Sequence, residues 1–64
     1  MSDSFVQGYV CAVATLVRVY DAQAEADYLL SALAPIKWRT TAEVDRKWLR
    51  DGGLVLKKYT KRHP

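Results

Sequence analysis

A helix is predicted by residues 5–20, Phe5-Val6-Gln7-Gly8-Tyr9-Val10-Cys11-Ala12-Val13-Ala14-Thr15-Leu16-Val17-Arg18-Val19-Tyr20. Apolar residues recur there at intervals of three and four, which is the spacing of a helix with one face in a core. The strict alternation of a half-buried strand is absent. Ser4 and Gln7 have the spacing of a capping box, in which side chains satisfy free amides at a helix start. We predict this helix over about residues 4–20.

The apolar stripe loses its phase near Asp21, because continuing it would turn Asp27 toward the core. A second helix is therefore predicted over about residues 22–34, with Asp21 as its N-cap and Pro35 after its end. Two helices joined by so short a connection are expected to pack as an antiparallel hairpin.

A third helix is predicted over about residues 41–51. Thr40 and Glu43 have the capping-box spacing, and Gly52 and Gly53 are typical of a helix stop. Its apolar side is predicted to hold Val44, Trp48 and Leu49, and its opposite side Glu43, Arg46, Lys47 and Arg50.

After the third helix, residues 54–59 are predicted as one extended segment, with continuation of the helix as the alternative. Residues 60–64 are expected to be a flexible tail. The expected fold is mainly α, a single domain of three short helices with a short C-terminal extended segment.

Sixty-four residues can bury only a marginal core, so a partner subunit or a bound target is expected to add stability. The single cysteine, Cys11, excludes an intrachain disulfide, and we expect it to be buried filler. The small-residue face of the first helix is predicted to pack against the second helix or against a second copy of the chain. Its members are Gly8, Cys11, Ala12 and Thr15.

No residue is assigned a catalytic, metal-binding or cofactor role. Cys11 and His63 are the only soft metal ligands and lie far apart in the sequence. Nothing in the sequence holds His63 beside a nucleophile. The first residues are acidic where a secretory signal needs positive charge, and the apolar stretch is too short to cross a bilayer. We therefore expect a non-enzymatic cytoplasmic protein.

Charge is divided unevenly along the chain. Residues 1–34 carry four acidic residues against Arg18, whereas residues 35–64 carry nine basic residues against three acidic ones. Cations can neutralise phosphates, and interleaved aromatic rings can stack on bases. The predicted binding residues are Lys37, Trp38, Arg39, Arg46, Lys47, Arg50, Lys57, Lys58 and Tyr59.

Residues 44–58, Val44-Asp45-Arg46-Lys47-Trp48-Leu49-Arg50-Asp51-Gly52-Gly53-Leu54-Val55-Leu56-Lys57-Lys58, resemble the recognition helix and first wing strand of winged-helix DNA-binding proteins. Members of that group often show a helix ending in Leu-x-x-x-Gly-Leu-Val, followed by basic residues. The resemblance implies a DNA-binding regulator with Arg46, Lys47 and Arg50 in the major groove. It implies that Lys57 and Lys58 contact the DNA backbone.

The first half of the chain resembles small proteins encoded by phages and prophages. The resemblance is carried by Gly8-Tyr9-Val10-Cys11-Ala12-Val13-Ala14 and by Ala26-Asp27-Tyr28-Leu29-Leu30. It implies a protein that binds a nucleic-acid-handling host protein or defence complex and inhibits it, in the manner of an anti-CRISPR protein. Direct DNA binding is the alternative, and a structural or assembly role is a third.

Overall fold

The structure is a computed structural model and describes residues 2–61, which form three α-helices and two short 3-10 helices with no strand among them. The helices are α1 (Asp3–Tyr20), α2 (Gln23–Leu33) and α3 (Glu43–Asp51), and the 3-10 helices are η1 (Trp38–Thr40) and η2 (Leu56–Tyr59). The predicted mainly α fold of three helices is confirmed, and the described residues are all-α. The helix bounds differ from the predicted ones by at most two residues.

The start of α1 differs from the prediction. Ser2 is the N-cap, and its side chain accepts a hydrogen bond from the Phe5 amide at 3.2 Å. Ser4 therefore lies inside the first turn, and the predicted capping box is wrong. Gln7 serves another purpose, because its Nε2 donates to the carbonyl oxygen of Thr40 at 2.7 Å and fixes η1 to α1.

Asp21 marks the predicted break, but it ends α1 and does not begin α2. Its φ of 55° is left-handed, a conformation that aspartate tolerates better than most residues. In this position its amide donates to the carbonyl oxygen of Val17, and the amide of Ala22 donates to that of Leu16, as at a helix C-cap. Ala22, without a side-chain cap, is the N-cap of α2.

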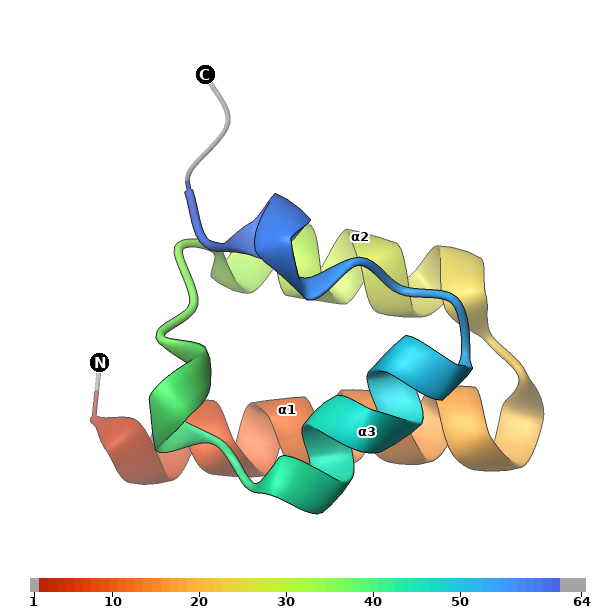
Figure 1. Cartoon of the computed structure of the whole chain (residues 1–64), viewed down its shortest axis with the longest axis horizontal. Coiled ribbons are helices and arrows are strands. Elements are labelled where there is room, and N and C mark those ends of the chain that lie inside the picture. The colour runs from red at the N-terminus through yellow and green to blue at the C-terminus, as the bar shows by residue number, and fades with distance from the viewer. Residues whose placement is uncertain (1, 62–64) are drawn as a thin grey trace.

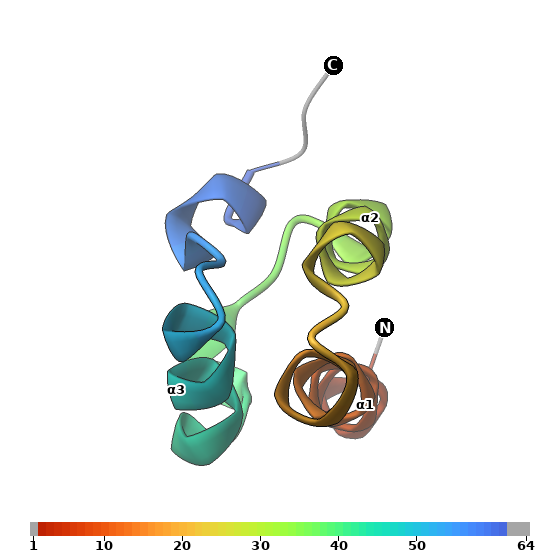
Figure 2. The ribbon, with the colours of Figure 1, turned by 90° about the vertical axis from the view of Figure 1, so that its right-hand side faces the viewer.

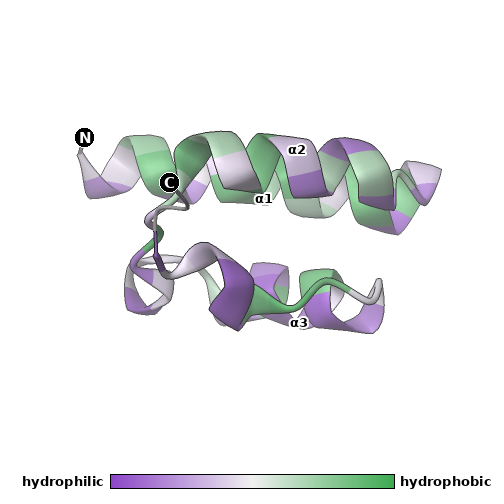
Figure 3. Ribbon diagram, turned by 90° about the horizontal axis from the view of Figure 1, so that it is seen from above, coloured by the Kyte–Doolittle hydropathy of each residue, from purple (hydrophilic) through white to green (hydrophobic). Residues whose placement is uncertain are grey.

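The elements form two layers. Figures 1 and 2 show α1 and α2 side by side and antiparallel, as predicted, with α3 beside α1 and η2 beyond α3 in the second layer. The core lies between the layers. Its buried residues are Val10, Val13, Ala14, Val17, Ala26, Leu30, Leu33, Ile36, Leu49, Leu54 and Tyr59. Figure 3 shows the layers from above, with large hydrophilic areas over α3 and both 3-10 helices.

The predicted extended segment over residues 54–59 is largely wrong. Val55 is extended, but Leu56–Tyr59 form η2. A 3-10 helix places residues three apart on the same side, so Leu56 and Tyr59 both turn inward. In a strand they would face opposite sides. The predicted tail is described only as far as Lys61, and its remainder lies outside the described residues.

The buried side of α3 also differs from the prediction. Leu49 is fully buried, but Val44 is 55% exposed and Trp48 is 37% exposed. Asp45 takes the inward position one turn before Leu49 and is only 8% exposed. The helix stop is confirmed, because α3 ends at Asp51 and Gly53 adopts a positive φ of 91°. No helix within residues 2–61 is long and apolar enough to cross a membrane.

Candidate binding surface

Two segments far apart in the sequence are joined at one end of the molecule. The amide of Ile36 donates to the carbonyl oxygen of Tyr59 at 2.9 Å. The Nε1 of Trp38 donates to the carbonyl oxygen of Leu56 at 2.8 Å. The rings of Trp38 and Tyr59 meet edge to face, with centroids 6.4 Å apart. These contacts hold the connection after α2 against η2, and Figure 1 shows both at the end opposite the α1–α2 turn.

Four exposed cations project from these joined segments, and we call them the cationic end. They are Lys37, Arg39, Lys57 and Lys61. Within residues 2–61 none of them forms an ion pair. Lys37 and Arg39 line a shallow hollow together with Ile36, Trp38 and Thr60. The arrangement places two cations without an ion pair, Lys37 and Arg39, beside a half-buried indole.

The carboxylate of Asp27 fastens η2 to α2. It accepts hydrogen bonds from Lys58 Nζ at 2.8 Å and from the Tyr59 hydroxyl at 2.6 Å. The hydrogen bond from Lys58, followed by that from Tyr59, lowers the pKa of Asp27 below its usual 3.8. Burial, followed by the hydrogen bond to Asp27, raises the pKa of Tyr59 well above its usual 10.0.

Two predicted binding residues, Lys58 and Tyr59, therefore form contacts within the protein. Tyr59 is only 1% exposed, so its ring has no face to offer a base, and this prediction is corrected. Lys58 is bound to Asp27, 31 residues earlier in the chain. No sequence pattern indicated Asp27 as their partner, because the three residues meet only after α2 and η2 are brought together.

Arg46 has a structural role that the sequence did not predict. Its Nη1 donates to the carbonyl oxygens of Trp38 and Thr41, each at 2.6 Å, and to the Thr41 hydroxyl at 3.0 Å. The guanidinium thereby joins α3 to η1. This geometry does not fit the winged-helix expectation, which needs Arg46 free to enter a DNA groove. The wing strand expected at residues 54–58 is absent as well.

The remaining predicted cations of α3 lie apart from the cationic end. Lys47 forms an ion pair with Asp51 at 2.9 Å, and Arg50 is exposed. The Lys47 ammonium and the Arg18 guanidinium lie over the Trp48 ring, 5.9 and 5.2 Å from its centroid. We call Arg18, Val44, Lys47 and Trp48 the Trp48 patch.

The cationic end and the Trp48 patch lie near opposite ends of α1. Thr40, next to Arg39, is bonded to Gln7 near the start of that helix. Trp48 instead shares a hollow with Val17 and Arg18 near its end. The predicted binding residues are thus divided between two separate surfaces.

The small-residue face of α1 is open. Gly8, Cys11, Ala12 and Thr15 are all exposed, and a Cβ added to Gly8 would meet nothing within 4 Å. The expected packing of this face against α2 is wrong, and so is the expected burial of Cys11. The helix α2 packs on a neighbouring side, where the Tyr9 hydroxyl donates to the carbonyl oxygen of Leu29 at 2.7 Å. Binding of a second copy stays a prediction.

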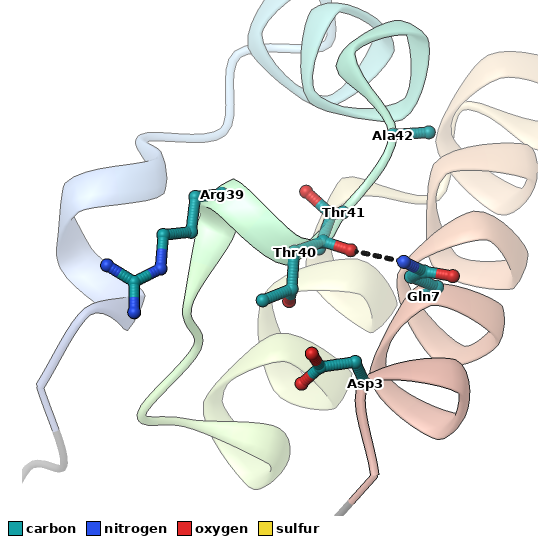
Figure 4. Close-up of a pocket in the computed structure, with 6 residues that line it drawn as sticks. All are labelled: Asp3, Gln7, Arg39, Thr40, Thr41 and Ala42. Carbon is teal, nitrogen blue, oxygen red and sulfur yellow. Dashed lines mark hydrogen bonds between the residues drawn. The ribbon is translucent and has the colours of Figure 1, made fainter.

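A further hollow, of about 600 Å³, lies between α1 and η1 and is lined by Asp3, Gln7, Arg39, Thr40, Thr41 and Ala42. Figure 4 shows Gln7 bonded across it to Thr40, with the Arg39 side chain pointing away. Both threonine hydroxyls donate to backbone carbonyl oxygens, those of Lys37 and Trp38. Nowhere in residues 2–61 do three or more His, Cys, Asp or Glu residues gather as a metal site would require.

Comparison with models of protein families, with curated proteins and with solved structures gives no match for this chain.

Proposed function

We propose that this protein acts by contact, as a nucleic-acid-binding module whose working surface is the cationic end. The supporting observation is that Lys37, Arg39, Lys57 and Lys61 are exposed and that no carboxylate within residues 2–61 pairs with them. Cations in this state bind phosphates and release the counterions that surround nucleic acid. A surface already neutralised by its own acidic residues would gain much less.

The surface of α3 is a weaker candidate for phosphate binding. Its exposed residues include Glu43 and Asp51 beside Lys47 and Arg50, so charges of both signs alternate there. Arg46 is bound to backbone carbonyls. The working surface proposed here is therefore the pair of joined segments and not the helix that the winged-helix resemblance indicated.

A second candidate function is inhibition of a nucleic-acid-handling protein through the Trp48 patch. The supporting observation is the partly exposed Trp48, which lies beside the exposed Val44 and beneath two cations. Tryptophan and arginine dominate the binding energy of protein interfaces. This candidate keeps the phage-type, anti-defence function that the sequence resemblance implies, and it uses a different surface.

Matched charge reversals test the proposal. The variant Lys37→Glu/Arg39→Glu changes the cationic end, and Lys47→Glu/Arg50→Glu makes the same change of net charge on α3. Binding of a fluorescein-labelled DNA duplex is measured by anisotropy between about 50 and 200 mM salt. Circular dichroism checks that both variants fold.

We expect the wild-type protein to bind with an affinity that falls steeply with salt, and the first variant to lose about tenfold or more. The α3 variant should lose clearly less, because its charges do not lie at the cationic end. A larger loss in the α3 variant would contradict the proposal. A duplex that fails to bind the wild-type protein at low salt would refute it.

A further inference from the structure

We propose that the cationic end recognises the phosphate backbone of nucleic acid and does not read its bases. This inference rests on the proposed function and specifies what the same surface detects. Recognition of sequence requires side chains that reach base edges with free donors or acceptors in fixed geometry. Base recognition by this surface would therefore need hydrogen-bonding side chains around the cationic end that are not already bonded within the chain.

Three neutral side-chain donors around the cationic end are already used within the chain. Trp38 Nε1 donates to the carbonyl oxygen of Leu56 at 2.8 Å. The hydroxyls of Thr40 and Thr60 donate to the carbonyl oxygens of Lys37 and Lys57, at 2.7 and 2.8 Å. These bonds shape the two joined segments, and a base could compete for the donors only by breaking them.

Stacking is also restricted. Proteins that bind bases by stacking present the face of an aromatic ring to solvent. Here Tyr59 is buried, and Trp38 is half-buried against the core with one side toward the Tyr59 ring. The part of Trp38 that stays accessible lines the hollow beside Lys37, Arg39 and Thr60.

Among the four cations Arg39 is the best suited to read a base. Its planar guanidinium can pair with two acceptors of guanine at once, whereas a lysine ammonium acts as a point charge. Arg39 has no hydrogen-bond partner within residues 2–61 that would fix its fork in one direction. A guanidinium that is not held in one orientation contributes its charge to binding but discriminates little between bases. Arg39 is therefore expected to act as one more phosphate contact.

The number of cations limits the salt dependence. Four phosphate contacts on duplex DNA give a slope of log K against log salt no steeper than about −3.6. Dissociation constants are then expected in the non-specific range, about 10⁻⁴–10⁻⁶ M.

The experiment compares two duplexes of equal length and base composition but different sequence, the matching single strand, and inorganic polyphosphate as a competitor. The variants are Arg39→Lys, which keeps the charge and removes the fork, and Arg39→Glu, which reverses the charge. We expect the two duplexes to bind within about twofold of each other, because a bidentate base contact would separate them by roughly fivefold or more.

Arg39→Lys should likewise stay within about twofold of the wild-type affinity, while Arg39→Glu loses clearly more. Polyphosphate should displace the duplex no better than unlabelled duplex does at equal phosphate concentration. Sequence preference of about fivefold, or a comparable loss in Arg39→Lys, would overturn backbone recognition but leave the proposed function standing. Polyphosphate binding about tenfold tighter would overturn nucleic acid as the source of the phosphate. Failure of every probe to bind would overturn both proposals.

Discussion

The carboxylate of Asp27 accepts a hydrogen bond of 2.6 Å from the hydroxyl of Tyr59, 32 residues further along the chain. With the bond from Lys58, this contact connects the hairpin of α1 and α2 to the C-terminal segment. Because that segment carries Lys57 and Lys61, Asp27 helps to position half of the cationic end, together with the bonds from Ile36 and Trp38. Stability and the proposed binding surface therefore depend on the same carboxylate.

Removing the Tyr59 hydroxyl should destabilise the fold. Tyr59→Phe keeps the buried ring but deletes one of the two bonds to Asp27. We expect a loss of about 1–2 kcal/mol in the free energy of unfolding, typical of a hydrogen bond to a charged group that is partly open to water. Urea titration followed by circular dichroism measures it. An unchanged midpoint would show that the contact contributes nothing.

Acid should weaken the same connection. The pKa of Asp27 is lowered in the folded protein, so its contribution is present above the unfolded value near 3.8 and is lost as the pH falls through the folded value. Thermal melts below pH 4 should fall more steeply for the wild-type protein than for Asp27→Asn, which has no carboxylate to protonate. If the melting temperatures of the two proteins fell equally with pH, the stabilising role given to the ionised Asp27 would be contradicted.

Alkali should act through Tyr59. Its pKa is raised in the folded protein, so its contribution is complete below the unfolded value of 10.0 and is lost as the pH rises above it. We expect wild-type stability to decline above pH 10 in melts where Tyr59→Phe shows a shallower decline. Equal declines would mean that Tyr59 ionises as easily in the folded state as in the unfolded state.

Arg46 and Lys47 are adjacent cations with different expected effects on stability. Arg46→Ala removes the donor to the carbonyl oxygens of Trp38 and Thr41, so we expect a loss of about 1–3 kcal/mol. Lys47→Ala removes an exposed ion pair with Asp51 and should cost about 0.5 kcal/mol or less. Chemical denaturation of both variants makes the comparison, and equal losses would refute the structural role of Arg46.

Two glycines should respond to alanine in opposite directions. Gly8 is exposed within α1 and has space for a Cβ, so Gly8→Ala should stabilise the monomer by about 0.5–1 kcal/mol. A Cβ on Gly52 would overlap Val17 Cγ1, so Gly52→Ala should destabilise by about 1–3 kcal/mol. Thermal melts at low protein concentration test both. Destabilisation by Gly8→Ala would indicate a contact on that face which the single chain does not show.

Apolar periodicity and helix-ending residues together were sufficient to predict the three helices, although the predicted apolar face of α3 was partly wrong. Pro35 and the Gly52-Gly53 pair end α2 and α3 as expected. The caps could not be predicted as well. Ser4 was expected to cap α1, but Ser2 does so. Thr40 was expected to open α3 with a capping box, but it lies in η1, and the N-cap of α3 is Ala42 without a side-chain hydrogen bond.

The candidate site was predicted by residue type more than by position. Lys37, Arg39 and Lys57 were chosen for their charge, and they do lie on the two joined segments. Arg46 was chosen for its charge and Tyr59 for its aromatic ring, but both are used internally. A long side chain can turn toward a backbone carbonyl or toward solvent, and nothing in its local sequence decides between the two. Cys11 was misplaced because α2 and α3 together leave that part of α1 uncovered.

The most direct test of the cationic end is a titration of the ¹⁵N-labelled protein with a short DNA duplex, followed by two-dimensional NMR. The two indole N–H signals report separately on the two surfaces, since Trp38 lies at the cationic end and Trp48 on α3. We predict shifts for residues 36–39 and 56–61 and for the Trp38 indole, with the Trp48 indole unchanged. Shifts concentrated in residues 43–51 and at the Trp48 indole would contradict the account.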